Sequence, residues 1–193
     1  MKQDFFDRLK DYFNEDSELF IKKLDDKYSQ GFFLNTNKCN RDKILELIDF
    51  DYYRSKYTDD SFNHDYDSIG KTKAYELGII YPQEIAASLS TKYIDKKDTK
   101  LVVDLCAAPG GKTINILNRL DKDVLCITNE INHTRSLILS SNLERLGLDN
   151  VIITNKKTKD LVNQLENCVD IVILDAPCSG EGIIRKYREI LDE

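Results

Sequence analysis

The sequence predicts an α/β protein in which a small α+β segment precedes the first four strands of a parallel, Rossmann-like sheet. From Lys100 onward, short apolar runs alternate with segments of helical periodicity. These runs are continuously apolar, as in parallel strands that are buried on both faces. Before Lys100 there is no such alternation, and 193 residues suffice for one domain with a small appendage.

The N-terminal part is predicted to begin with helices and to continue with a strand and a further helix. Apolar side chains recur at helical spacing over 3–30 and indicate two amphipathic helices. A short strand is expected at 31–35 and a helix at 41–49. We assign residues 1–75 to a small α+β domain that faces RNA, an assignment that depends partly on a family resemblance described below.

The connection to the second part is polar and aromatic. Residues 51–73 indicate a loop with one strand, and Pro82 suits the first turn of a helix that runs to about Tyr93. We assign residues 76–193 to the N-terminal half of a cofactor-binding α/β domain.

Four strands and three intervening helices are expected in this second part. The strands are predicted at 101–105, 124–128, 151–154 and 169–175, and the helices at 112–120, 132–147 and 158–167. The middle helix should end at Gly147 and turn four apolar residues inward: Ile138, Leu139, Leu143 and Leu146. The last strand is strongly apolar and nothing follows to cover its far edge, so we expect a fragment of a longer domain.

Composition limits the function classes. The net charge is -6, which does not favour avid nucleic-acid binding through charge alone. The five cysteines form no C-x-x-C pair and there are two histidines, both expected at the surface, so a zinc site is not favoured. No apolar stretch reaches the length of a membrane span and no secretion signal is present, so we expect a cytoplasmic protein without membrane contact. If the chain is complete, we expect a monomer.

A glycine-rich segment, DLCAAPGGKT (104–113), lies between the first parallel strand and its helix. Ligands bind at this place in open α/β sheets, and Gly110 and Gly111 would let the backbone approach one closely. The helix that follows offers free N–H groups to an anionic group. One ligand that fits is a nucleotide phosphate, because Cys106 to Thr113 matches the Walker A pattern except for its first glycine. The other is S-adenosylmethionine.

Glu130 favours the second ligand. It follows the second parallel strand, where an acid can reach the ribose hydroxyls of an adenosine cofactor that lies across the sheet. A Walker A protein has no such requirement, and its tight turn needs the missing glycine. The alternative interpretation of Glu130 is a solvated loop acid.

A second candidate site, DAPCSG (175–180), follows the fourth parallel strand. Asp175 is expected to face the same crevice as Asp104 and Glu130, with Cys178 beside it. A Pro-Cys pair at this place fits methylation of pyrimidine C5, since C5 becomes nucleophilic only after a thiolate has added to C6. The alternative is that Cys178 is a small packing residue.

Both segments resemble motifs I and IV of the Nol–Nop–Sun family of RNA cytosine-C5 methyltransferases. The similarity continues through EGIIRK (181–186), which resembles the RsmF-like enzymes of the RsmB/RsmF-like group, whose substrate is small-subunit rRNA. Upstream, FLNTNK (33–38) is similar to a strand of the family's RNA-facing domain, and YPQE (81–84) to the entry of its methyltransferase domain.

The resemblance implies a role for each motif. The methionine end of S-adenosylmethionine would be lined by the loop residues Cys106, Ala107, Ala108, Pro109, Gly110, Gly111 and Lys112. Glu130 would hold the ribose, and Asp175 would stand between the cofactor and the target cytosine. Cys178 would assist release of the covalent RNA adduct. In place of an acid that contacts adenine in many relatives, this chain has Lys157, and Asn155 is an alternative partner.

The family's nucleophile is a second cysteine, in a Thr-Cys motif after a fifth strand. This chain has no Thr-Cys pair, so the resemblance implies that the nucleophile is absent. The sequence therefore favours an rRNA (cytosine-C5) methyltransferase that uses S-adenosylmethionine and small-subunit rRNA. A non-catalytic RNA-binding remnant and a P-loop NTPase remain the alternatives.

Overall fold

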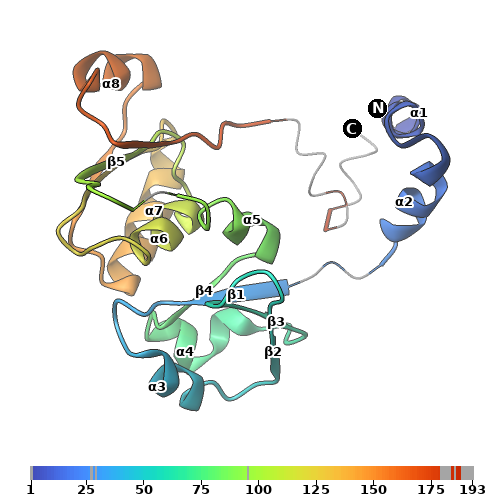
Figure 1. Ribbon diagram of the computed structural model, residues 1–193, viewed down its shortest axis with the longest axis horizontal. Helices are drawn as coiled ribbons and strands as arrows, with labels where there is room; N and C mark the ends of the chain where they lie inside the picture. The colour runs from blue at the N-terminus through green and yellow to red at the C-terminus, as the bar shows by residue number, and fades with distance from the viewer. Residues whose placement is uncertain are drawn as a thin grey trace. The chain divides into compact units, whose positions relative to one another are not determined.

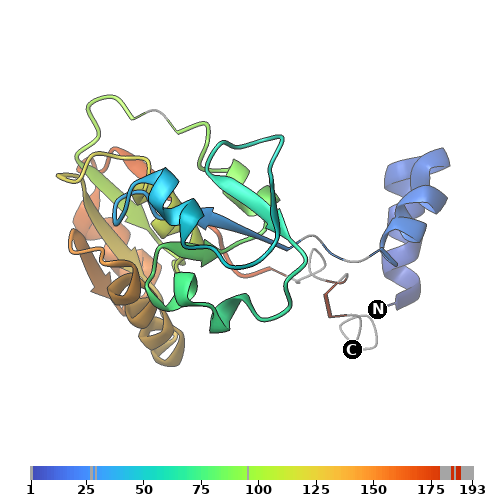
Figure 2. The same cartoon turned by 90° about the horizontal axis from the view of Figure 1, so that it is seen from below.

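The computed structural model describes residues 2–26, 28, 30–94, 96–178, 184 and 186–187. It divides into two compact units, of which one consists of Met1–Tyr28 and Pro177–Glu193 and the other of Ser29–Ala176. The larger unit holds two four-stranded sheets, with helices packed on each (Figure 1 and Figure 2). No described helix is long and apolar enough to cross a membrane.

The smaller unit contains the two predicted amphipathic helices, α1 (Lys2–Phe13) and α2 (Ser17–Lys23), joined by the 3-10 turn η1 (Asn14–Asp16). Phe5 and Leu9 of α1 are buried and pack with Ile184. The helical spacing of the apolar residues is thus explained by a small core within this unit.

The first sheet of the larger unit is antiparallel, with the order β2-β3-β1-β4. Its strands are β1 (Gln30–Leu34), β2 (Tyr52–Arg54), β3 (Ser61–His64) and β4 (Ile80–Pro82). Two short helices accompany it: α3 (Arg41–Glu46), whose Lys43 N–H is capped by Asn40, and α4 (Lys73–Glu76), capped by Thr72. Its core is built around the fully buried Phe32.

Three expectations for this region are wrong. Residues 51–73 contain two strands and the 3-10 helix η2 (Ile69–Lys71), because strands this short carry little periodic signal among turn residues. Pro82 ends β4 rather than beginning a helix; it is tolerated because β4 is an edge strand, and α5 is confined to Ile85–Leu89. His64 is buried, and its ring packs against Phe32.

The second sheet is parallel, with the order β7-β6-β5-β8, and confirms the predicted α/β class. Its strands are β5 (Leu101–Asp104), β6 (Leu125–Asn129), β7 (Val151–Thr154) and β8 (Ile171–Ile173). The helices are α6 (Gly111–Leu117), α7 (His133–Leu146) and α8 (Thr158–Leu165). Val102 packs against α6, whereas Val103 faces α8 on the opposite side of the sheet (Figure 1).

Two details of the parallel sheet differ from the prediction. Ile138 is 50% exposed, while Leu139, Leu143 and Leu146 are buried as expected. The last strand is shorter than predicted, and as the sheet's edge it leaves Val172 59% exposed.

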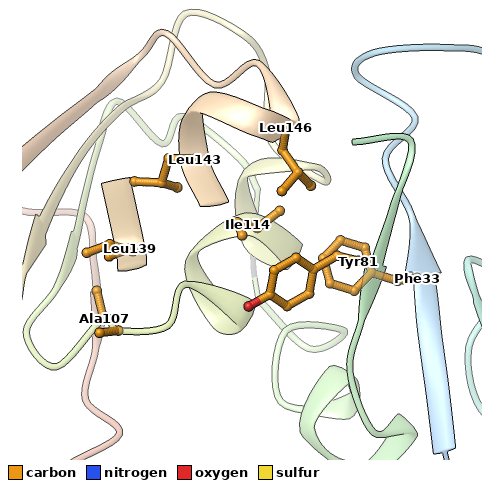
Figure 3. Packing of buried hydrophobic residues seen from close by; sticks show 8 residues of the cluster. Phe33, Tyr81, Ala107, Ile114, Leu139, Leu143 and Leu146 are labelled. Atoms are coloured by element: carbon orange, nitrogen blue, oxygen red, sulfur yellow. The ribbon is translucent and has the colours of Figure 1, made fainter. Parts of the chain in front are cut away.

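The two sheets of the larger unit share a hydrophobic core. Phe33 of β1 and Tyr81 of β4 pack against Ile114 of α6 and the buried leucines of α7 (Figure 3). The buried Asn35 side chain joins the two layers, because its amide donates to the carbonyls of Gly78 and Leu146, both at 2.9 Å. The domain boundary predicted after residue 75 stays a prediction; β4 lies beyond that boundary and pairs with β1.

The Gly78 turn offers a test of this packing. Gly78 has φ +63, and a Cβ there would lie 2.0 Å from the backbone oxygen of Arg145. We expect Gly78→Ala to lower the free energy of unfolding by about 1–3 kcal/mol or more, because overpacking is added to a strained backbone. Urea denaturation followed by circular dichroism measures this. Gly70→Ala is the matched control, since a Cβ there meets nothing within 4 Å. Equal stability of the two variants would contradict the packing argument.

Candidate functional site

A cavity of about 170 Å³ opens where β5 and β8 end, between the glycine-rich loop and the connection from β4 to α5. It is lined by Tyr81, Pro82, Gln83, Asp104, Cys106, Ala107, Ala108, Pro109, Gly111, Lys112 and Asp175. Seven of the predicted site residues thus border one space: Cys106, Ala107, Ala108, Pro109, Gly111, Lys112 and Asp175. Gly110 and Glu130 are not among the lining residues.

The two glycines of the loop, Gly110 and Gly111, leave room for neighbouring side chains of the protein. Gly110 has φ +112, which an L side chain rarely adopts, and it stands directly before α6. A Cβ on Gly111 would lie 2.8 Å from Nε2 of Gln83 and 3.3 Å from the Tyr81 ring. The glycine at 111 therefore allows β4 and its connection to form a wall of the cavity. The close approach of a ligand to this loop stays a prediction.

Asp104 is buried at the end of β5 and shapes the loop. Its carboxylate accepts hydrogen bonds from the Thr113 hydroxyl at 2.6 Å and from the Cys106 N–H at 3.3 Å. Burial raises the pKa of Asp104, and these two hydrogen bonds and Lys112 oppose the rise. Thr113 is fully buried with its hydroxyl already engaged, whereas a Walker A threonine must hold Mg²⁺. The loop therefore does not fit the Walker A type of phosphate-binding loop.

Glu130 is 3% exposed, so its interpretation as a solvated loop acid is wrong. One carboxylate oxygen accepts the Asn132 N–H at 2.9 Å, and the other lies 3.3 Å from the Arg135 guanidinium. The same guanidinium donates to the carbonyl of Ala108 at 2.6 Å. Arg135 thus ties the acid after β6 to the loop after β5. The predicted contact of Glu130 with a ribose stays a prediction.

Charged side chains of the site shift the pKa of the Cys106 thiol. Burial raises the pKa of this thiol, and the negative charges of Asp104, Glu130 and Asp175 raise it further, while Arg135 lowers it. Carboxylates at the ends of three different strands therefore act on one thiol. This is the arrangement expected where the carboxyl ends of parallel strands meet.

Asp175 lines the cavity and forms an ion pair with Lys112. Its side chain is 60% exposed, so it is accessible to a ligand. Cys178 is also exposed, but it belongs to the smaller unit, so its place beside the crevice stays a prediction. Asn155 donates its amide to the Glu130 carbonyl, which leaves its predicted contact with adenine untested.

Asn129 lies directly before Glu130, and sequence reasoning assigned it no role. It is fully buried, and its amide donates to the carbonyls of Leu105 and Lys156 at 3.3 and 3.0 Å. Its oxygen accepts from Thr154 Oγ1 and from the Lys156 N–H. Asn129 therefore joins the ends of β5, β6 and β7. Its signal in the sequence is a buried-strand position occupied by an amide, directly before Glu130.

Comparison with known proteins adds independent information. The family model described as 16S rRNA methyltransferase RsmB/F matches residues 91–192. The tRNA (cytosine(49)-C(5))-methyltransferase of Pyrococcus abyssi is 33% identical over 179 residues, which cover 89% of this chain and 57% of that enzyme. The ribosomal RNA small subunit methyltransferase F of Escherichia coli is 34% identical over 131 residues, which cover 67% of this chain and 27% of that enzyme.

A solved structure agrees with these sequence matches. A methyltransferase homolog protein from Pyrococcus horikoshii has a TM-score of 0.80 and 27% identity, covering 92% of this chain and 60% of that one. The chain thus spans 60% or less of these three proteins, and their names describe the longer proteins.

The pH dependence of Cys106 alkylation tests the charge arrangement. Because Asp104 contributes the largest charge effect on this thiol, Asp104→Asn should lower the pH at which Cys106 becomes reactive. Peptide-level mass spectrometry after iodoacetamide treatment at a series of pH values measures the midpoint. Asp123→Asn serves as control, because Asp123 is paired with Lys100 at the surface. An unchanged midpoint in Asp104→Asn would show that the carboxylate does not act on this thiol.

Proposed function

Because the chain belongs to the RsmB/F family of 16S rRNA methyltransferases, we propose that it acts as part of an RNA cytosine-C5 methyltransferase that uses S-adenosylmethionine and acts on small-subunit rRNA. The observation that carries the proposal is the cavity at the carboxyl ends of β5 and β8, bordered by the motif I loop and by Asp175. The family description favours rRNA over the tRNA named for the Pyrococcus relative.

The loop from Cys106 to Lys112 would hold the methionine end of the cofactor, and Glu130 its ribose. The Glu130 carboxylate uses one hydrogen bond and one ion pair within the protein. A carboxylate has about four acceptor positions, so lone pairs remain with which Glu130 would accept from the ribose hydroxyls. Because Arg135 and the Asn132 N–H already fix the carboxylate, little side-chain entropy is lost when a ribose binds.

Asp175 is proposed to contact the target base. Its exposed carboxylate accepts hydrogen bonds, and cytosine, unlike uracil, presents an amino donor. Lys112 forms an ion pair with this carboxylate and holds it in place. Bound S-adenosylmethionine would supply an electrophilic methyl group to C5 of cytosine, which becomes nucleophilic once a thiolate has added to C6. S-adenosylhomocysteine would leave, and loss of the C5 proton would expel the thiolate. We assign to this chain the cofactor and base contacts and not the nucleophile, because the sequence contains no Thr-Cys pair.

Calorimetry with S-adenosylmethionine tests the cofactor site. Glu130→Gln should weaken binding by about 1–3 kcal/mol, because hydrogen bonds to a charged group are lost. Glu144→Gln is the matched control, since Glu144 lies on α7 and bonds only to Ser140 among the described side chains. ATP with Mg²⁺ should not bind. Binding of ATP but not of S-adenosylmethionine would favour the P-loop alternative, and binding of neither would favour the non-catalytic remnant.

The Cys178 thiol is proposed to serve release of the RNA adduct and not attack. Incubation of the 193-residue protein with S-adenosylmethionine and rRNA that contains 5-fluorocytosine should therefore give no covalent adduct. Denaturing gel electrophoresis detects such an adduct as a slowly migrating band. A band that disappears in Cys178→Ser would show that Cys178 is a nucleophile.

A further inference from the structure

Gln83 lines the cavity. Neither the sequence motifs nor the proposed function assigns a role to this residue. It follows β4 directly, and its backbone N–H donates to the Gly31 carbonyl at 2.8 Å. This bond extends the pairing between β1 and β4 by one step and directs the Gln83 side chain toward the glycine-rich loop. The residue is thus held by its backbone, and its side chain is held by Ser88 and Asn115.

A chain of hydrogen bonds settles which end of the Gln83 amide faces the cavity. It begins at Arg119, whose guanidinium can only donate, and whose Nε lies 3.0 Å from Oδ1 of Asn115. The oxygen of the Asn115 amide is therefore turned toward Arg119, and the nitrogen lies on the other side. That nitrogen donates to Oε1 of Gln83 at 3.0 Å.

The buried Ser88 hydroxyl makes the second contact to the same oxygen, at 2.9 Å. With two donors on Oε1, the amide cannot turn over without placing its NH₂ group against the Asn115 NH₂ group. Nε2 of Gln83 therefore points away from this network, toward Gly111. Nε2 donates no hydrogen bond to any of the described residues.

The cavity thus contains an oriented, unused pair of N–H donors over the loop from Cys106 to Lys112. Donors of this kind bind a group that accepts hydrogen bonds, and a carboxylate is the strongest such acceptor on the proposed ligand. Resting on the proposed function, which places the methionine end of S-adenosylmethionine against this loop, we infer that Gln83 determines specificity by donating to the carboxylate of that methionine end. The ammonium group of the same ligand is matched by the exposed carboxylate of Asp175, which lines the same cavity.

A pair of ligands separates this contact from a general structural effect. S-adenosylhomocysteine carries the amino-acid group, whereas 5′-methylthioadenosine has the same adenosine and sulfur without it. Gln83→Glu keeps the oxygen that Ser88 and Asn115 bind and replaces the donor by an anionic acceptor. We expect Gln83→Glu to raise the Kd for S-adenosylhomocysteine by about tenfold or more and to leave that for 5′-methylthioadenosine nearly unchanged. Gln164→Glu on the exposed face of α8 controls for the added charge.

Two further variants keep the test decisive if the charge disturbs folding. Gln83→Met retains the volume without the donor and should give the same ligand-selective loss. Ser88→Ala lies outside the cavity lining and releases the amide, so it should give a smaller loss of the same kind. Thermal melting of each variant shows that the protein remains folded.

The outcomes are distinct. Equal weakening of both ligands, or of neither, would overturn the Gln83 contact while the proposed function stands. Weakened binding of cytidine-containing RNA with unchanged S-adenosylhomocysteine binding would place the donor on the target base and would also overturn it. A wild-type chain that binds neither ligand would overturn the proposed function together with the contact.

Discussion

The buried side chain of Asn35 holds the antiparallel sheet against the parallel one. Its amide donates to carbonyls from two different layers, Gly78 beside β4 and Leu146 at the end of α7. Both carbonyls would be costly to leave unpaired in the interior. Arg145 adds a second connection, since it donates to the Tyr75 carbonyl at 2.6 Å and its guanidinium lies 3.8 Å from the centre of the Tyr75 ring. The shared core of Phe33, Tyr81 and the α7 leucines can close only because these polar groups are satisfied.

This junction has a direct consequence for the cavity. One wall comes from the parallel sheet, as the loop between β5 and α6, and the other from β4 and its connection to α5. Asn118 at the end of α6 donates to the Leu34 carbonyl and accepts from the Asn37 N–H, so α6 is also tied to β1. The antiparallel sheet therefore does more than accompany the cofactor-binding half. It sets where Gln83 and Tyr81 lie relative to Gly111, at distances that a single methyl group would disturb.

The site is organised by carboxylates with three different environments. Asp104 is buried and accepts a hydrogen bond from the Thr113 hydroxyl. Glu130 is buried and forms an ion pair with Arg135. Asp175 is exposed and forms an ion pair with Lys112. The two buried groups support the loop, and the exposed one remains accessible. Asn129 connects the strand ends behind them, so a substitution there would displace three loops at once.

The sequence by itself determined the parallel sheet, its helices and the two motifs, because buried parallel strands are continuously apolar and their carboxyl ends bring motif residues together. It also placed Gly147 correctly as the end of α7, since the left-handed conformation there favours glycine. Only the tertiary structure decided the roles of Pro82, His64 and Gln83. Pro82 is compatible with a helix start or an edge strand, and its pairing with Phe32 in the neighbouring strand decides between them. The direction of the Gln83 amide depends on Asn115, which reaches Gln83 only when α6 packs against the antiparallel sheet. Local patterns specify elements, whereas polarity and burial at a site depend on partners that are distant in the sequence.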